Sequence, residues 1–281
     1  MGDLLVQIII ALVTGAASSA LVVFLGIKSL KDYMKNNEIK REYGNLMSFW
    51  SAGEVGGTYT LIFGSEPGNA AEFEVEPRVG YSQAFGIAEI TRLLETLHEG
   101  RATIQTVLLS KNDPLPKAAF NNHVLLFGGE LVLSRFRQFC LDLGVPFYQH
   151  NLKLDRRSFT RLYNASVVEE LTSQVKYGEN KLFCDIGTVT RIINPLNGKL
   201  LFLFNGNYSA GLLGAILATT RKENFQYQSY DRTKPAQQAV VEVPNIQDNL
   251  IAREHPIIMR GWIQFQITAP QVTKGLDKAS A

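Results

Sequence analysis

Two turns that contain glycine are the strongest candidates for ligand binding in this sequence of 281 residues. Each turn follows a short apolar run and precedes a segment with helical periodicity. A glycine at a strand end leaves room for a ligand, and the N–H groups at a helix N-terminus bind oxygen acceptors. The first turn supplies four candidate contacts, which are Gly128, Gly129, Glu130 and Ser134. Because Glu130 is acidic, this turn favours ligand hydroxyls or a base over a bare phosphate.

The second turn supplies four more candidate contacts, which are Gly206, Asn207, Ser209 and Gly211. Ser209 is suited to cap the helix that follows, because its hydroxyl can accept from a helical N–H group. The glycines follow the spacing G-x4-G-x2-G, which is neither the G-x-G-x-x-G dinucleotide fingerprint nor a P-loop. Close packing of a helix on a strand explains such glycines equally well, so both interpretations stay open.

Two carboxylates are candidates for catalysis. Asp185 precedes Gly187 and Thr188, which we include among the candidate binding residues. Asp185 could contact ribose hydroxyls, act as a base or cap a turn. Glu89 lies in a predicted helix over residues 82–99 and is the carboxylate suited to act as general base or nucleophile. An exposed helical glutamate is the alternative, and the sequence leaves open whether the protein is an enzyme.

Other residue types argue against several chemistries. The histidines and cysteines share no metal-ligand spacing, and they are His98, His123, His150, His255, Cys140 and Cys184. We therefore predict no metal site. No G-x-S-x-G elbow or kinase signature is present. The net charge of +2 does not indicate binding to nucleic acid.

Alternating strands and helices must position these residues. Strands are predicted at 58–63, 103–109, 123–127 and 199–204, and helices at 82–99, 130–143 and 210–220. The pattern predicts an α/β fold with a Rossmann-like, mostly parallel sheet. Residues 149–193 are expected to form shorter strands and loops. Two β-rich runs after Gln237 are expected to form antiparallel edge strands at the C-terminus.

The N-terminus carries a long apolar segment. Residues 4–27 contain no charged side chain, and at about 1.5 Å per residue they are long enough to cross a hydrocarbon core of about 30 Å. We expect one transmembrane helix, with a cleaved signal peptide as the alternative. Basic residues follow the segment, at Lys28, Lys31, Lys35, Lys40 and Arg41. They predict a single-pass protein of the cell membrane whose C-terminal domain is cytoplasmic.

Three segments follow from these patterns. They are a transmembrane anchor at 1–28, a juxtamembrane connector helix at 29–52 and a cytoplasmic α/β domain at 53–281. Small residues four apart, Ala11, Gly15 and Ser19, would allow helices to associate within the lipid bilayer. The expected partners are therefore the bilayer, a second copy of the chain and a protein partner.

The order of the motifs resembles that of bacterial membrane-anchored Rossmann-like proteins of the nucleotide-sensor kind. The resemblance covers about residues 58–220. It rests on the Gly-Tyr-Ser helix start at Gly80, the Gly128 turn, the run from Asp185 to Gly198 and the turn at Gly206. Glu130 and Leu133 stand where a G-G-P-x-x-N turn would have proline and asparagine. The resemblance implies that the ligand is a nucleotide or a nucleotide derivative.

Three functions are compatible with the sequence. The leading hypothesis is a single-pass membrane protein whose cytoplasmic domain binds a nucleotide-derived ligand as a signalling sensor or effector. The first alternative is an enzyme that cleaves a nucleotide or N-glycosidic bond with Glu89 or Asp185. The second alternative is a non-catalytic membrane scaffold for a protein partner.

Overall fold

The chain divides into two compact units, residues 1–44 and 45–281. The computed structural model describes residues 28–29, 31, 34–35, 37–44, 46–51, 56–64, 80–109, 116–128, 148–153, 156–163, 166–176, 181–225, 230–246 and 256–265. In the first unit, the described residues are helical and mostly exposed. The second unit holds the sheets and the two long helices discussed below.

The predicted fold class requires a correction at the N-terminus. Among the described residues, no helix is both long enough and apolar enough to cross a membrane. This finding contradicts the predicted fold class, in which a transmembrane helix precedes the α/β domain. The predicted span at 4–27 lies outside the described residues, together with Ala11, Gly15 and Ser19.

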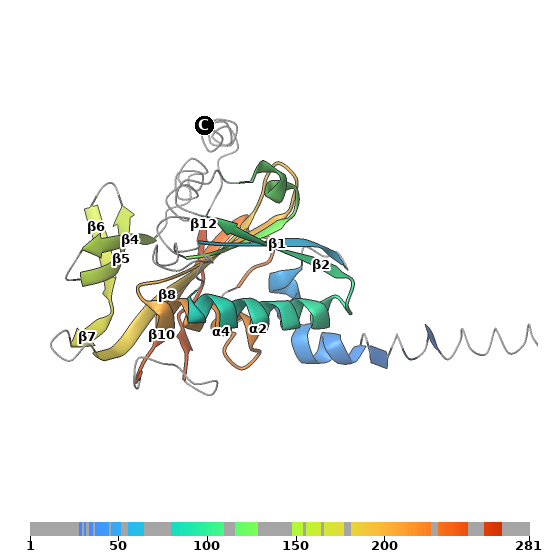
Figure 1. The fold of residues 1–281 in the computed structure, drawn as a ribbon, viewed down its shortest axis with the longest axis horizontal. Helices are drawn as coiled ribbons and strands as arrows, with labels where there is room; N and C mark the ends of the chain where they lie inside the picture. Colours follow the sequence, from blue (N-terminus) through green and yellow to red (C-terminus); the bar gives the residue numbers. More distant parts are fainter. Residues whose placement is uncertain are drawn as a thin grey trace, which may run out of the picture. The chain divides into compact units, whose positions relative to one another are not determined.

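Within the described residues, the second unit is built on a nine-stranded sheet (Figure 1). The strand order is β2 (Ala102–Leu109), β1 (Gly57–Gly64), β3 (His123–Phe127), β9 (Leu200–Gly206), β8 (Lys181–Ile193), β10 (Ala236–Val243) and β11 (Ile258–Met259). In addition, β12 (Ile263–Phe265) pairs with β10, and β7 (Gln174–Lys176) pairs with β8. The first four strands are parallel, and a 3-10 helix, η1 (Lys117–Asn121), precedes β3.

Antiparallel pairing begins in the middle of this sheet, at β8. The sequence analysis expected antiparallel strands only at the C-terminal edge and short strands before residue 193. Instead, β8 is 13 residues long and runs antiparallel to both β9 and β10. The turn from Asn194 to Lys199 joins β8 to β9, and a turn this short cannot make the crossover that parallel strands need. The mixed α/β architecture is nevertheless consistent with a Rossmann-like arrangement.

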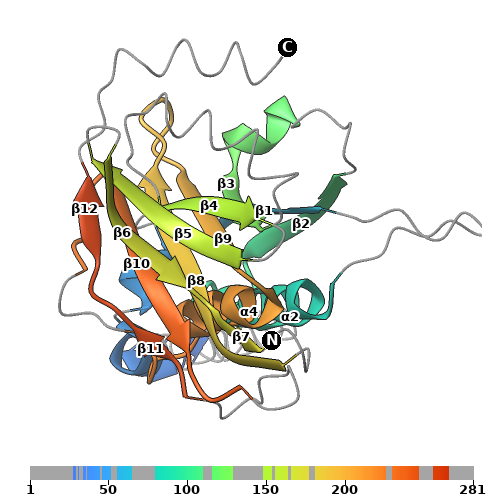
Figure 2. The same ribbon diagram turned by 90° about the vertical axis from the view of Figure 1, so that its left-hand side faces the viewer.

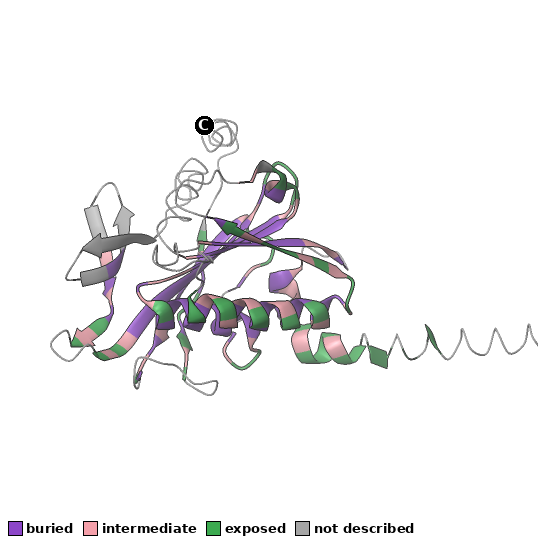
Figure 3. Cartoon of the chain, in the orientation of Figure 1, coloured by how far each residue is buried: buried purple, intermediate pink, exposed green. Residues whose placement is uncertain are grey.

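Two helices pack together on one face of the sheet (Figure 1). Helix α2 (Tyr81–Leu97) connects β1 to β2, and α4 (Ser209–Thr220) connects β9 to β10 across β8. At their contact, a Cβ atom on Gly86 would collide with the Ile216 side chain, so the glycine permits the close approach. Every residue of α4 from Ala210 to Thr220 is buried, whereas α2 keeps an exposed side (Figure 3).

A smaller sheet covers part of the opposite face (Figure 2). It consists of β4 (Tyr148–Lys153), β5 (Arg156–Tyr163) and β6 (Ser166–Thr172). Phe159 and Leu171 of the small sheet pack against Ile186 and Val240 of the large one. Strands β8 and β10 are thus covered on both faces. The helix predicted at 130–143 lies outside the described residues.

The helical residues 46–50 belong to the core of the second unit. Phe49 and Trp50 are both 0% exposed. The Phe49 ring contacts the rings of five aromatic residues, which are Trp50, Phe202, Phe225, Tyr230 and Trp262. The sequence analysis placed these residues in a connector that ended at 52, whereas the compact unit begins at residue 45.

The backbone of this helical turn is also held by the rest of the domain. Its carbonyl groups accept from the Tyr230 hydroxyl at Ser48 (3.1 Å), from Arg191 Nε at Phe49 (3.1 Å) and from the Tyr59 hydroxyl at Trp50 (3.2 Å). The last carbonyl groups of a helix have no partner within the helix, so buried ones need donors from elsewhere. In return, Trp50 Nε1 donates to the Thr219 carbonyl at 2.6 Å.

A buried histidine extends this network. His98 Nε2 lies 2.7 Å from the Tyr59 hydroxyl, and the Gly56 N–H group donates to His98 Nδ1 at 3.1 Å. Since Nδ1 accepts a hydrogen bond, it carries no proton in this arrangement. Burial lowers the pKa of His98, and the charge of Arg101 lowers it further. The neutral imidazole is therefore the form that fits the fold.

We predict that Trp50→Ala in the full chain lowers the free energy of unfolding by about 3–5 kcal/mol, because it removes a fully buried indole and strands the Thr219 carbonyl. Urea denaturation measures the loss. The control is Leu196→Ala, since Leu196 is 54% exposed and should change stability by less than about 0.5 kcal/mol. A loss below about 1 kcal/mol for Trp50→Ala would place residues 46–50 outside the cooperative core.

We also predict that acid destabilises the domain through His98. In the unfolded chain His98 takes up a proton near its ordinary pKa of 6.5, while the folded form resists protonation because its pKa is lowered. Stability is therefore complete above pH 6.5 and falls as the pH drops from there toward the lowered pKa. Urea denaturation at several pH values should show a shallower fall for His98→Gln. Identical pH profiles for the two proteins would contradict this assignment.

Candidate functional site

Asp185, one of the two proposed catalytic residues, is buried at the N-terminus of α4. Its Oδ2 accepts from the Gly211 N–H group at 2.5 Å, and its Oδ1 accepts from Ile186 N–H at 2.8 Å and the Ser173 hydroxyl at 2.7 Å. Burial raises the pKa of Asp185, and these bonds with one from the Tyr208 backbone oppose the rise. In Rossmann-like folds a ligand anion often occupies this position at a helix N-terminus. Here an internal carboxylate occupies it.

The glycines around Asp185 permit close packing of α4 on the sheet. A Cβ atom on Gly187 would collide with the Gly211 carbonyl oxygen, and one on Gly211 would collide with the Ile186 carbonyl oxygen. A Cβ atom on Gly206 would collide with the backbone nitrogen of Leu212. The structure thus supplies the packing role that the sequence analysis left open as the alternative to ligand contact.

The polar residues of the same turn are also engaged within the protein. Asn207 is fully buried, its backbone N–H donates to the Ile186 carbonyl at 2.9 Å and its Nδ2 donates to the Ser173 hydroxyl at 3.0 Å. Ser209 is the first residue of α4, and the N-cap is Tyr208 with no side-chain cap. The expected Ser209 cap is therefore replaced by Asp185. Thr188 is buried in β8 opposite Val240.

The first glycine turn is described only at its start. The Gly128 N–H group donates to the Phe204 carbonyl at 2.8 Å, and Gln83 Nε2 donates to the Gly128 carbonyl at 3.0 Å. A Cβ atom on Gly128 would meet Asn205 Oδ1 at 2.7 Å, so this glycine allows β3 and β9 to end side by side. Gly129, Glu130 and Ser134 lie outside the described residues, and their contact with a ligand stays a prediction.

Glu89, the other proposed catalytic residue, lies between two arginines. It is 8% exposed, with its Oε2 at 3.0 Å from Arg92 Nη2 and its Oε1 at 4.0 Å from Arg221 Nη2. Arg92 is on α2 and Arg221 follows the last residue of α4. The carboxylate therefore links the two helices electrostatically.

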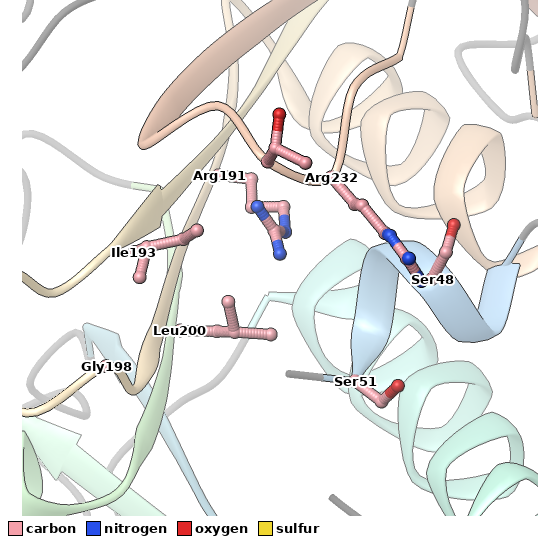
Figure 4. A pocket seen from close by; sticks show the side chains of 8 residues that line it. Ser48, Ser51, Arg191, Ile193, Gly198, Leu200 and Arg232 are labelled. Carbon is pink, nitrogen blue, oxygen red and sulfur yellow. The ribbon is translucent and has the colours of Figure 1, made fainter. Parts of the chain in front are cut away.

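A cavity of about 320 Å³ lies where β8 ends and β9 begins (Figure 4). None of the candidate residues of the two glycine turns lines it. Its lining residues are Ser48, Ser51, Arg191, Ile193, Gly198, Leu200, Arg232 and Thr233. We call it the arginine pocket. Because β9 starts at Leu200, the pocket is at the amino end of the parallel strands, whereas ligands of open α/β sheets bind at the carboxyl end.

Arg191 forms the buried wall of the arginine pocket. The residue is 2% exposed, and its Nε is bonded to the Phe49 carbonyl. Its Nη1 is buried and has no hydrogen-bond partner among the described residues. The guanidinium carbon lies 5.7 Å from the centre of the Tyr230 ring. Burial lowers the pKa of Arg191 and Tyr230 acts in the opposite direction, but a guanidinium remains protonated in proteins.

Arg232 reaches the same pocket from a structured turn before β10. Gln237 holds this turn, because its Oε1 accepts from Asp231 N–H at 3.0 Å and its Nε2 donates to the Asp231 carbonyl at 2.5 Å. Asp231 Oδ1 in turn accepts from the Thr233 N–H at 2.9 Å and hydroxyl at 2.6 Å. Gln237 is paired with Arg191 across the β8 and β10 strands, so the register brings the two arginines to one place.

The turn between β8 and β9 completes the pocket. Asn194 organises it, since its carbonyl accepts from Gly198 N–H at 2.7 Å and its Oδ1 accepts from Leu196 N–H at 3.0 Å. Gly198 has a φ of +71°, a left-handed conformation that suits glycine. The apolar side chains of Ile193 and Leu200 flank the turn and face the cavity (Figure 4).

The lining of the arginine pocket is positively charged. Two guanidinium groups line it, and none of its lining residues is acidic. Arginine donates in a planar fork that matches carboxylate and phosphate oxygens. The lining of the pocket is therefore suited to an anion in its charge.

Neither arginine was among the candidate residues expected from the sequence. Arg191 interrupts the apolar run of β8, and a single charge within a buried strand is a signal that could have identified it. Arg232 lies in an exposed, polar turn, and nothing in its local sequence distinguishes it from a surface arginine. Only the strand register brings the two residues together.

We predict that Asp185→Asn lowers the free energy of unfolding by about 2–3 kcal/mol, because an amide has one acceptor oxygen and its NH₂ group would face buried donors. Urea denaturation measures the loss. Asp231→Asn is the matched control, and its effect should be much smaller because Asp231 is only partly buried, whereas Asp185 is fully buried. Unchanged stability of the Asp185 variant would show that the carboxylate is not needed as a cap.

Comparisons with known proteins add no relative. No protein-family model matches the chain, and no curated protein or solved structure is significantly similar to it. The candidate site therefore rests on the geometry of this chain alone.

Proposed function

We propose that residues 45–281 form a ligand-binding domain that holds a small organic anion in the arginine pocket. One observation carries the proposal, which is that Arg191 lines the cavity and its buried Nη1 group has no hydrogen-bond partner among the described residues. A buried donor without a partner costs free energy, and the cost is larger when the group is charged. An oxygen of a bound anion would remove this cost.

A purely structural role for Arg191 explains less of its geometry. The bond from Nε to the Phe49 carbonyl caps a helix end, and a positive charge is favoured there. A cap of this kind explains neither the Nη1 group, which has no partner among the described residues, nor a second arginine on the same cavity. The presence of Arg232 on the same cavity favours ligand binding.

The size of the pocket agrees with a small ligand. Its volume of about 320 Å³ is at the lower end of the range for small-molecule sites, about 300–1,000 Å³. The anion would lie against the arginines, and an organic body against Ile193 and Leu200. A nucleotide-derived ligand, the leading hypothesis from the sequence, is one member of this class.

A binding role for the pocket is favoured over a catalytic one. Glu89 and Asp185 do not line the arginine pocket, and each is engaged by other groups of the protein. A sensor or effector module needs only a ligand and a fold that responds to it. The scaffold hypothesis stays a prediction from the sequence.

We predict that the full chain binds adenosine 5′-monophosphate, phenyl phosphate or benzoate in calorimetry, and that Arg191→Met weakens binding at least tenfold. The same substitution should lower the free energy of unfolding by about 1–3 kcal/mol, because it leaves the buried Phe49 carbonyl without its donor, so affinity is measured on protein shown to be folded. A ligand at 100 times its dissociation constant should stabilise the unmodified protein by about 2.7 kcal/mol.

The matched control is Arg92→Gln, since the Arg92 side chain is 58% exposed and lies outside the pocket. It should leave affinity unchanged. Absence of binding by all three compounds would overturn the proposal. Strong destabilisation by Arg191→Met, with affinity retained in the folded fraction, would make Arg191 a structural cap only.

A further inference from the structure

We infer that the arginine pocket selects a phosphomonoester in its dianionic form, and that Arg232 is the residue that distinguishes two negative charges from one. This inference rests on the proposed function and names the ligand class of the same site. It follows from the number, burial and origin of the charges around the cavity.

Two of the hydroxyl donors in the pocket already form hydrogen bonds within the protein. The Ser51 hydroxyl already donates to the Met47 carbonyl at 2.8 Å, and the Thr233 hydroxyl donates to Asp231 Oδ1 at 2.6 Å. These two hydroxyls are therefore occupied as donors within the protein. The two guanidinium groups are the charged donors of the lining, so we expect recognition to depend mainly on charge.

The two positive charges of the pocket favour a ligand with two negative charges. Arg191 is buried and no described carboxylate forms an ion pair with it, while Arg232 faces the same cavity from the exposed turn. A single negative charge bound to Arg191 would leave Arg232 without a counter-charge in the pocket. A dianion neutralises both groups. At a separation of about 4 Å near a protein surface, the Coulomb energy of one such charge pair corresponds to more than a tenfold difference in affinity. A dianion should therefore bind clearly more tightly than a monoanion.

The shape of a phosphomonoester also suits the arrangement of the lining residues. A phosphomonoester has three terminal oxygens and one ester oxygen that carries the organic body. The two guanidinium groups approach from different elements, β8 and the turn before β10, and can bind different terminal oxygens. Ile193 and Leu200 provide apolar contacts for the organic body. A planar carboxylate has two oxygens and at most one charge.

The residues that line the pocket include no histidine and no carboxylate. A guanidinium group stays protonated in proteins. The bonds from Thr233 lower the pKa of Asp231, and the other charged residues beside the pocket are Lys234 on the same turn and Lys199 after Gly198. Tyr230 lies against Arg191, and residues 46–51 contribute no charge. Any pH dependence of affinity in this range must therefore come from the ligand, since a phosphomonoester loses its second charge near pH 6.

The test compares two ligands with the same aromatic body on the full chain. Phenyl phosphate is a monoester and becomes dianionic, whereas methyl phenyl phosphate is a diester with one charge. Calorimetry at pH 7.5 should give at least tenfold tighter binding of the monoester. Between pH 7 and pH 5 its affinity should fall about tenfold, as the dianion is protonated. The affinity of the diester should stay constant.

Arg232→Gln identifies the residue that distinguishes the charges. Because the side chain lies on an exposed turn, this variant should fold normally, and it should bind the two ligands within about threefold of one another with a flat pH profile. Arg92→Gln should preserve the preference for the monoester. Preference retained in Arg232→Gln would overturn the assignment to Arg232.

The remaining outcomes separate this inference from the proposed function. If both ligands bind equally and without pH dependence, the pocket binds anions but does not select a dianion, and the inference fails alone. If neither ligand nor any other tested anion binds, both the inference and the proposed function fail.

Discussion

The domain depends on the burial of one helical turn, residues 46–50, against the sheet. Phe49 and Trp50 supply apolar surface, but the backbone carbonyls of Ser48, Phe49 and Trp50 could not be buried without donors. The Tyr59 hydroxyl, Arg191 Nε and the Tyr230 hydroxyl supply those donors. This requirement places a charged residue inside the protein and fixes its Nε toward the turn. Arg191 also lines the arginine pocket, so the candidate site is a consequence of how the turn is held.

Helix α4 shows the same principle with the opposite charge. It is buried on all sides, so its N-terminal N–H groups need an acceptor, and Asp185 provides one from the neighbouring strand. The glycines at 187, 206 and 211 let the backbones approach closely enough for this bond to form. The helix end that binds an anion in Rossmann-like folds is therefore satisfied here by a side chain of the protein itself. The cationic pocket lies at the other end of the strands.

Local patterns predicted much of the secondary structure and little of the site. Apolar runs gave β1, β3 and β9 nearly to their ends, because such strands are buried on both faces. Strand β8 was not recognised, since Asp185 and Arg191 interrupt its apolar character. Their partners, α4 and residues 46–50, are remote in sequence, so local periodicity cannot show that the charges are compensated. The glycines were identified correctly as special positions, but only coordinates distinguish close packing from space for a ligand.

The aromatic cluster around Phe49 also constrains the order in which the domain can be completed. The Tyr230 hydroxyl reaches Ser48 across 182 residues of chain, and Trp50 reaches the Thr219 carbonyl across 169. During synthesis, this turn therefore leaves the ribosome long before the residues that bury it. Such non-local contacts favour slow folding, and they leave large apolar rings uncovered in the nascent chain. A chaperone that shields this turn would protect the growing polypeptide until its C-terminal strands arrive.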